Sequence, residues 1–96
     1  MTLANTKDGK AQLMHPQGKK MPRIDREKYE VIKKAMLSIL KEKELTHNEL
    51  FDELDKRLKG KFGGSIGWYS EGVKLDLEAR KVIERTDSKP QKYRII

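Results

Sequence analysis

The chain has 96 residues, no cysteine, a charged fraction of 39% and a net charge of +7. This length supports one small domain, and the absence of cysteine excludes disulfides and thiolate metal sites. No segment has the apolar run of a membrane span or a signal peptide, so we expect a cytoplasmic protein that does not bind a membrane. The positive excess favours an anionic partner, such as nucleic acid or an acidic protein surface.

Residues 1–24 form a distinct first segment, with five basic side chains against one acidic and with scattered glycines and prolines. Its apolar residues are spaced too irregularly for an amphipathic helix or strand. We therefore expect a flexible basic N-terminal arm before a domain formed by residues 25–96. The alternative is that the segment docks on that domain as a clamp, and the pattern leaves this choice open.

Two helices are predicted after the arm. The first runs from about Asp25, which can cap it, to Glu42, and its apolar residues form one stripe at helical spacing. The second begins at Thr46, because Thr46 and Glu49 match the capping box, in which the two side chains satisfy amide groups at the helix start. Gly60 marks its end, since glycine tolerates the left-handed conformation found there.

A third helix is predicted from a cap at Ser65 to Lys81. The helical period of about 100° per residue separates two faces. The expected inward residues are Ile66, Tyr69, Val73 and Leu77. The expected outward residues are Trp68, Glu71, Leu75 and Glu78. Two large apolar side chains on the outward face are unusual for a soluble helix.

Two short strands are predicted after the third helix, Val82 to Thr86 and Gln91 to Ile95, with a polar turn at 87–90. Alternation assigns Ile83, Tyr93 and Ile95 to the inward face of this hairpin. The predicted fold class is therefore mainly α with a small β-hairpin. Three helices followed by such a hairpin are the order of a winged helix-turn-helix.

The sequence LEARKVIER at 77–85, followed by a polar turn and KYRI at 92–95, resembles the junction of helix and wing in bacterial winged-helix regulators. With GWY at 67–69 and VKLDL at 73–77, the chain resembles a small family of uncharacterised bacterial winged-helix proteins over about residues 25–96. The resemblance implies the winged-helix fold and, by analogy, DNA binding. Such regulators commonly end the helix on glycine, where this chain has Lys81.

The leading functional hypothesis is a transcriptional regulator that binds duplex DNA, with the wing and the arm contacting phosphates. Residues 65–83 carry three basic and three acidic side chains, so we expect mainly electrostatic binding with weak base readout. The predicted nucleic-acid-binding residues are Lys59, Lys61, Ser65, Trp68, Lys74, Lys89, Lys92 and Arg94.

The alternative hypothesis is a winged helix that associates with another protein or with a second copy and does not bind DNA. Trp68 and Leu75 are the predicted contact residues, because exposed apolar side chains favour a protein partner over DNA. A third possibility for Trp68 is packing beneath the arm or the wing.

No catalytic, metal or cofactor site is predicted. His15 and His47 have no ligand companions at metal-binding spacing, and the acidic residues follow helix-surface spacing with lysine partners. The glycines at 60, 63 and 64 are not followed by the lysine and hydroxyl residues of a phosphate loop. We therefore expect a binding protein without metal or cofactor rather than an enzyme.

Overall fold

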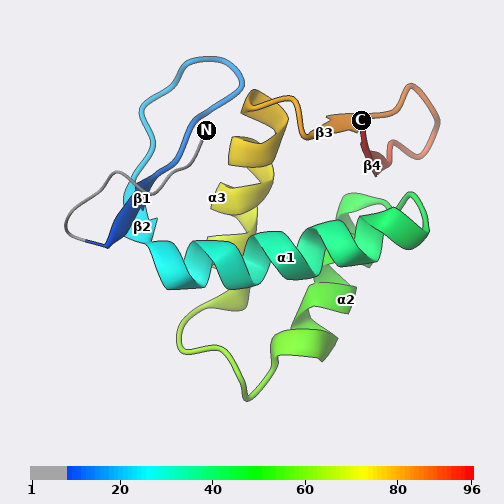
Figure 1. Cartoon of the computed structure of the whole chain (residues 1–96). Coiled ribbons are helices and arrows are strands. Elements are labelled where there is room, and N and C mark those ends of the chain that lie inside the picture. The colour runs from blue at the N-terminus through cyan, green and yellow to red at the C-terminus, as the bar shows by residue number, and fades with distance from the viewer. Residues whose placement is uncertain (1–8) are drawn as a thin grey trace.

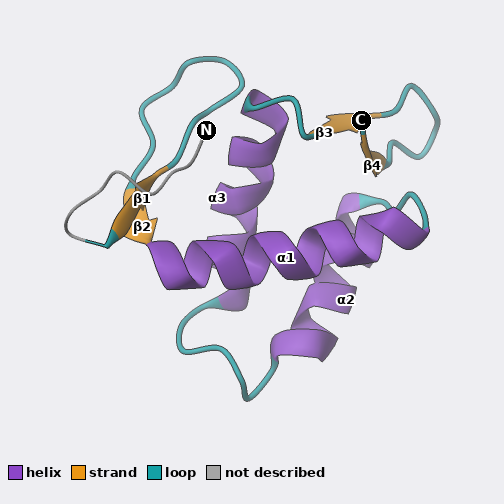
Figure 2. Ribbon diagram, viewed as in Figure 1, coloured by secondary structure: helices purple, strands orange, loops and turns teal. Residues whose placement is uncertain are grey.

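A computed structural model describes residues 9–96, which form three helices and two small antiparallel hairpins (Figure 1). The elements in chain order are β1 (Lys10–Gln12), β2 (Arg23–Asp25), α1 (Arg26–Glu42), α2 (His47–Leu58), α3 (Ile66–Ala79), β3 (Ile83–Arg85) and β4 (Tyr93–Ile95). One hairpin precedes the helices and the other follows them. In the view of Figure 2 the two pairs of strands lie on opposite sides of α3. The result is a small mixed α/β domain.

The helix starts follow the caps predicted from the sequence. At α2, the Thr46 hydroxyl accepts from the Glu49 amide over 3.2 Å, and the Glu49 carboxylate accepts from the Thr46 amide over 2.9 Å. The hydrogen bond from the Thr46 amide to the carboxylate lowers the pKa of Glu49. Asp25 and Ser65 cap α1 and α3 through their side-chain oxygens. Gly60, just beyond α2, has a φ of 77°, as its predicted position at the helix end requires.

One hydrophobic core joins the three helices and both hairpins. Its fully buried large residues include Tyr29, Ile32, Met36, Leu50, Leu54, Val73, Leu77 and Ile83. All of these except Ile83, which lies in β3, belong to the apolar stripes of the helices, because packing selects the apolar stripe of each helix. Ile66 and Tyr69 are only partly buried and pack against the edge of this core.

A single residue between α1 and α2 adds to the C-terminal hairpin. The amide of Tyr93 donates to the carbonyl of Leu45 over 2.7 Å, and the amide of Leu45 donates back over 3.3 Å. Both side chains are buried. The connection after α1 is therefore fastened to β4, which places the hairpin against the core.

The C-terminal part differs from its prediction in three ways. α3 ends at Ala79 rather than at Lys81, and the two strands are shorter than predicted. Ile95 was expected inward but is 37% exposed, whereas Ile83, its partner across the hairpin, is buried. Lys81 lies just past the helix with a φ of 64°, the left-handed conformation that favours glycine.

The end of α3 is a Schellman motif. The amide of Lys81 donates to the carbonyl of Glu78 over 3.1 Å, and the amide of Val82 donates to the carbonyl of Leu77 over 2.9 Å. These two hydrogen bonds satisfy carbonyl groups that the helix leaves free at its end. Lys81 occupies the position in this motif that glycine fills most easily.

The N-terminal segment contains regular structure that the sequence pattern did not reveal. β1 and β2 pair so that Ala11 lies opposite Ile24, and Ala11, Leu13 and Ile24 are buried. The prediction of an arm without an ordered element is wrong for the described part of this segment. The apolar residues on either side of a long turn pair across the hairpin and are buried together. Of the two alternatives for the segment, docking is the arrangement in its described part. Residues 1–8 lie outside the described residues.

Candidate binding surface on the third helix and the two hairpins

A buried carboxylate fixes the N-terminal hairpin to α3. Asp76 is fully buried and accepts from the amide of Met14 over 2.8 Å and from the hydroxyl of Tyr29 over 2.5 Å. Arg80 donates through Nε to both oxygens of Asp76 over 3.0 Å, and through Nη2 to the carbonyl of Gln12 over 3.2 Å. Burial and the hydrogen bond to Asp76 raise the pKa of Tyr29, so its hydroxyl remains a donor.

The hairpin approaches α3 closely because residue 72 is a glycine. A Cβ atom added at Gly72 would lie 2.9 Å from Cδ1 of Leu13, which is shorter than an ordinary van der Waals contact. Leu13 therefore rests directly on the helix backbone. Close packing at this point, together with the hydrogen bonds to Asp76, sets the distance between the two elements.

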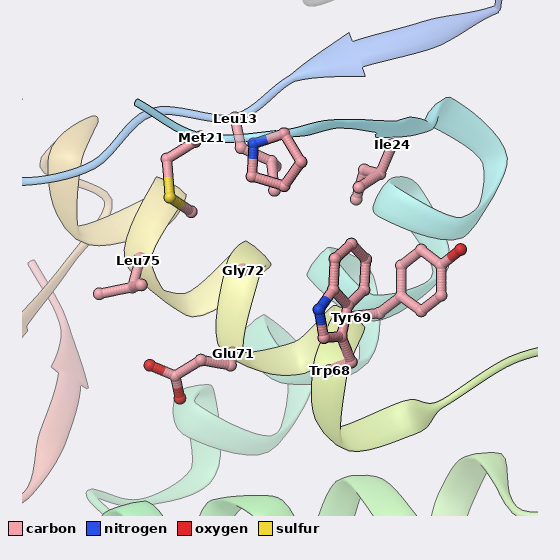
Figure 3. A pocket seen from close by; sticks show the side chains of 9 residues that line it. Leu13, Met21, Ile24, Trp68, Tyr69, Glu71, Gly72 and Leu75 are labelled. Atoms are coloured by element: carbon pink, nitrogen blue, oxygen red, sulfur yellow. The ribbon is translucent and has the colours of Figure 1, made fainter. Parts of the chain in front are cut away.

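Beside this contact, the hairpin and α3 enclose an apolar pocket of about 160 Å³. Its lining consists of Leu13, Met21, Pro22, Ile24, Trp68, Tyr69, Glu71, Gly72 and Leu75. In Figure 3, Leu13, Met21 and Ile24 point from the hairpin toward α3, and the ring of Trp68 rises from the start of the helix toward them.

The rim of this pocket carries one exposed aromatic ring and one carboxylate. Trp68 is 54% exposed and stacks edge-on against Tyr69, with ring centroids 4.9 Å apart. The carboxylate of Glu71 turns away from the hairpin in Figure 3, and its Oε1 lies 3.7 Å from Nζ of Lys74. The third possibility for Trp68, burial beneath the hairpin, does not agree with this exposure.

A second, polar hollow joins the two hairpins. It is lined by His15, Pro16, Gln17 and Lys19 from the β1–β2 loop, Leu75 and Glu78 from α3, and Arg85 from β3. Inside it, Arg85 Nε donates to Glu78 over 2.6 Å, and this hydrogen bond raises the pKa of Arg85. The loop of the first hairpin and the start of the second therefore share one face with the end of α3.

Two of the predicted DNA contacts are engaged within the protein. Lys74 is 3% exposed, and its Nζ donates to the hydroxyl of Tyr93 over 3.0 Å. Its prediction as a nucleic-acid contact is wrong, because a buried ammonium group cannot reach a phosphate. Arg94 is exposed but lies 2.8 Å from Glu84 and 3.6 Å from Glu44, so carboxylates already balance its charge.

The remaining predicted lysines fall into two separate groups. Lys59 and Lys61 lie in the turn before α3, whereas Lys89 and Lys92 lie in the loop after β3. Figure 1 shows these two loops at opposite ends of α3. A helix of 14 residues is about 21 Å long, so the structure does not bring the two groups together.

The two predicted contacts at the start and middle of α3 have local roles. The hydroxyl oxygen of Ser65 accepts from the amide of Trp68 over 3.2 Å and so caps the helix. Leu75 is half-buried, and it lines both the apolar pocket and the polar hollow. Trp68 and Leu75, the predicted protein contacts, thus meet at one pocket.

The predicted nucleic-acid-binding residues did not include the lysines of the β1–β2 loop, of which Lys19 lines the polar hollow together with Arg85. Lys19 and Lys20 lie in the β1–β2 loop and are exposed. The adjacent lysines after Gly18 were a visible signal of a basic loop, but their position depends on the pairing of β1 with β2. Lys81, at the end of α3, is also exposed.

Residues 9–96 contain no cluster of three or more His, Asp or Glu side chains suited to a metal ion. None of the described helices combines the length and the hydrophobicity that a bilayer crossing needs.

The comparisons with known proteins identify a family but no characterised relative. No curated protein and no solved structure matches the chain. The model of DUF6958, a family of unknown function, matches residues 10–93. The match begins at β1, so the family unit includes the N-terminal hairpin, which the expected resemblance over about 25–96 left out. The chain therefore belongs to the DUF6958 family of unknown function.

Proposed function

We propose that this protein is a winged-helix DNA-binding protein, and specifically a transcriptional regulator. In this proposal the phosphate contacts come from the face where the β1–β2 loop meets the C-terminal hairpin, which acts as the wing. The observation that carries it is the polar hollow shared by Lys19 of the first hairpin and Arg85 of the second. If the arm and the wing were separate, each would contact only a few phosphates and bind weakly. Side chains on one shared face can contact successive phosphates of the same DNA backbone.

The element order supports the winged-helix assignment. Three helices are followed directly by a hairpin, and Leu45, between the first two helices, pairs with Tyr93 of β4. This order is the one expected of a winged helix, with the C-terminal hairpin as the wing.

Several lysines near the two hairpins are available to an external anion. Lys19 and Lys20 in the β1–β2 loop, Lys81 after α3 and Lys89 in the β3–β4 loop are exposed, and none of them forms an ion pair among the described residues. Lysines that bind phosphates release condensed counterions, which gives affinity without base recognition. The net charge of +7 favours the same encounter at long range.

The outward side of α3 is poorly suited to base readout. Trp68 and Glu71 are exposed there, whereas Leu75 is half-buried and the Glu78 side chain is 9% exposed and bonded to Arg85. Carboxylates facing phosphates oppose binding, and apolar side chains supply no hydrogen bonds to the base edges of most sequences. We therefore expect weak dependence on DNA sequence.

Fluorescence anisotropy with a labelled duplex, measured over a series of salt concentrations, tests this proposal. We expect Lys19→Ala, Lys20→Ala and Lys89→Ala each to reduce the slope of log Kobs against log salt by about 0.9. The matched control is Lys59→Ala with Lys61→Ala, at the opposite end of α3, which should leave the slope unchanged. Absence of wild-type binding at micromolar protein in low salt, or an equal effect of the control, would contradict the proposal.

A further inference from the structure

We infer that the apolar pocket between the N-terminal hairpin and α3 is a docking site for an acidic linear segment of another protein. One large apolar side chain of that segment enters between Leu13, Met21 and Leu75, and its acidic neighbours meet Lys19 and Lys20. This inference goes beyond DNA binding and does not depend on it.

The size and lining of the pocket favour a single side chain. Its volume of about 160 Å³ is smaller than the roughly 300–1,000 Å³ of typical small-molecule sites. Glu71 is the one charged residue in its lining, and its carboxylate turns away from the hairpin. Trp68, 54% exposed at the rim, is of the residue type most enriched among energetically important contacts.

The pocket is held in shape before any partner arrives. Asp76 fixes the backbone of Met14, and Gly72 lets Leu13 rest on the helix. A preformed site avoids the entropy cost of ordering its walls during binding. The pocket is therefore suited to a short segment that supplies few contacts.

The charges around the pocket select an acidic segment. Glu71 is already 3.7 Å from the ammonium group of Lys74, so little negative charge is left for a basic partner. An adjoining hollow shares Leu13 and Met21 with the pocket, and it is also lined by Lys19 and Lys20. Carboxylates on either side of an apolar anchor would reach these two ammonium groups.

A second copy of the chain fits this surface less well. Each copy carries a net charge of +7, so two copies repel one another. The exposed apolar surface here is one small pocket, one indole ring and the side chain of Met14, whereas stable interfaces bury about 800 Å² on each partner. A linear segment needs much less contact area than a second folded domain.

Selection from a random linear peptide library displayed on phage, with the full chain immobilised, tests the inference. We expect enriched peptides to share one large apolar residue flanked by Asp or Glu. A synthetic version of an enriched peptide should shift the fluorescence emission of Trp68, the one tryptophan of the chain. Leu75→Glu should weaken the binding of this peptide roughly tenfold or more. Val31→Glu is the matched control, because Val31 is 44% exposed on α1 and does not line the pocket.

Further variants keep the result interpretable. If Leu75→Glu does not fold, Trp68→Ala is the second variant, because it removes an exposed side chain. It should weaken binding of the same peptide, which amide chemical shifts can follow in the absence of the tryptophan. Lys89→Ala should weaken DNA binding and leave peptide binding unchanged, so the experiment distinguishes failure of the docking site from failure of DNA binding. The inference is overturned by the absence of enrichment, by enrichment of basic peptides, or by equal binding to the pocket variants. Self-association that Leu75→Glu abolishes would identify a second copy as the occupant and would also overturn it.

Discussion

Met14 and Asp76 lie 62 positions apart in the sequence, and the amide of Met14 donates to Oδ1 of Asp76 over 2.8 Å. The same carboxylate holds the hydroxyl of Tyr29, so one buried residue of α3 connects the N-terminal hairpin with α1. The family match begins at residue 10, which agrees with a domain that includes this hairpin. The N-terminal hairpin is therefore part of the folded unit rather than an appendage.

Replacement of Asp76 by alanine should strongly destabilise the protein. It leaves the Tyr29 hydroxyl and the Met14 amide without their acceptor and removes the partner of Arg80. Loss of one member of a buried charged network costs about 3 kcal/mol or more. Urea denaturation should show this decrease in the free energy of unfolding, whereas Asp52→Ala, at an exposed position of α2, should change it by less than about 0.5 kcal/mol.

Tyr29 should make stability depend on alkaline pH. Burial and the hydrogen bond to Asp76 raise its pKa in the folded protein above the value of about 10 in an unfolded chain. The neutral phenol is the favoured form, so its contribution is complete below about pH 10 and decreases as the pH rises further. We expect the stability difference between wild type and Tyr29→Phe, measured by urea denaturation, to shrink above that pH. A constant difference would argue against the raised pKa.

Ser70→Ala should stabilise the protein by about 1 kcal/mol. The hydroxyl of Ser70 is buried within α3 and has no hydrogen-bond partner among the described residues. Its burial costs free energy that alanine avoids, and alanine also has the higher helix propensity. Thermal unfolding measures the gain, with Ser38→Ala as the control at an exposed helical position. A destabilised Ser70→Ala variant would mean that the hydroxyl has a partner.

Lys81→Gly should also stabilise the protein, by about 1 kcal/mol. The φ of 64° places a side chain in the left-handed conformation at the end of α3, and glycine adopts it without steric cost. The control Lys81→Ala removes the same long side chain but keeps Cβ, so it should not gain this stability. Equal unfolding midpoints for the glycine and alanine variants would show that the backbone conformation is not strained.

The three helices could be predicted because their signals are local. Thr46 and Glu49 satisfy each other's backbone amides within one turn, and Asp25 and Ser65 cap their own helices. The apolar stripes repeat at the helical period, so they also indicated which faces are buried. Neither signal depends on where another part of the chain lies.

The candidate site could be predicted only in part. Trp68 and Leu75 were expected on the outward face of the third helix, and they line one pocket. The opposite wall of that pocket comes from the N-terminal hairpin, which the sequence pattern did not reveal. Lys74 was expected at the surface, but the ring of Tyr93 lies over its ammonium group at 4.6 Å. Contacts between distant segments decided both outcomes.

The sequence by itself determined the helices, their caps, the order of the helices and the C-terminal hairpin, and the excess of positive charge, because each of these depends on neighbouring residues or on composition. The tertiary structure alone decided that the N-terminal segment docks on α3, that Lys74 is buried, and that Lys19 lies near Arg85. The physical reason is that burial and charge pairing depend on which surfaces meet in space. Asp76 illustrates this. Its position in the sequence is typical of a surface carboxylate, but in the structure Met14, Tyr29 and Arg80 all donate to it and it is buried.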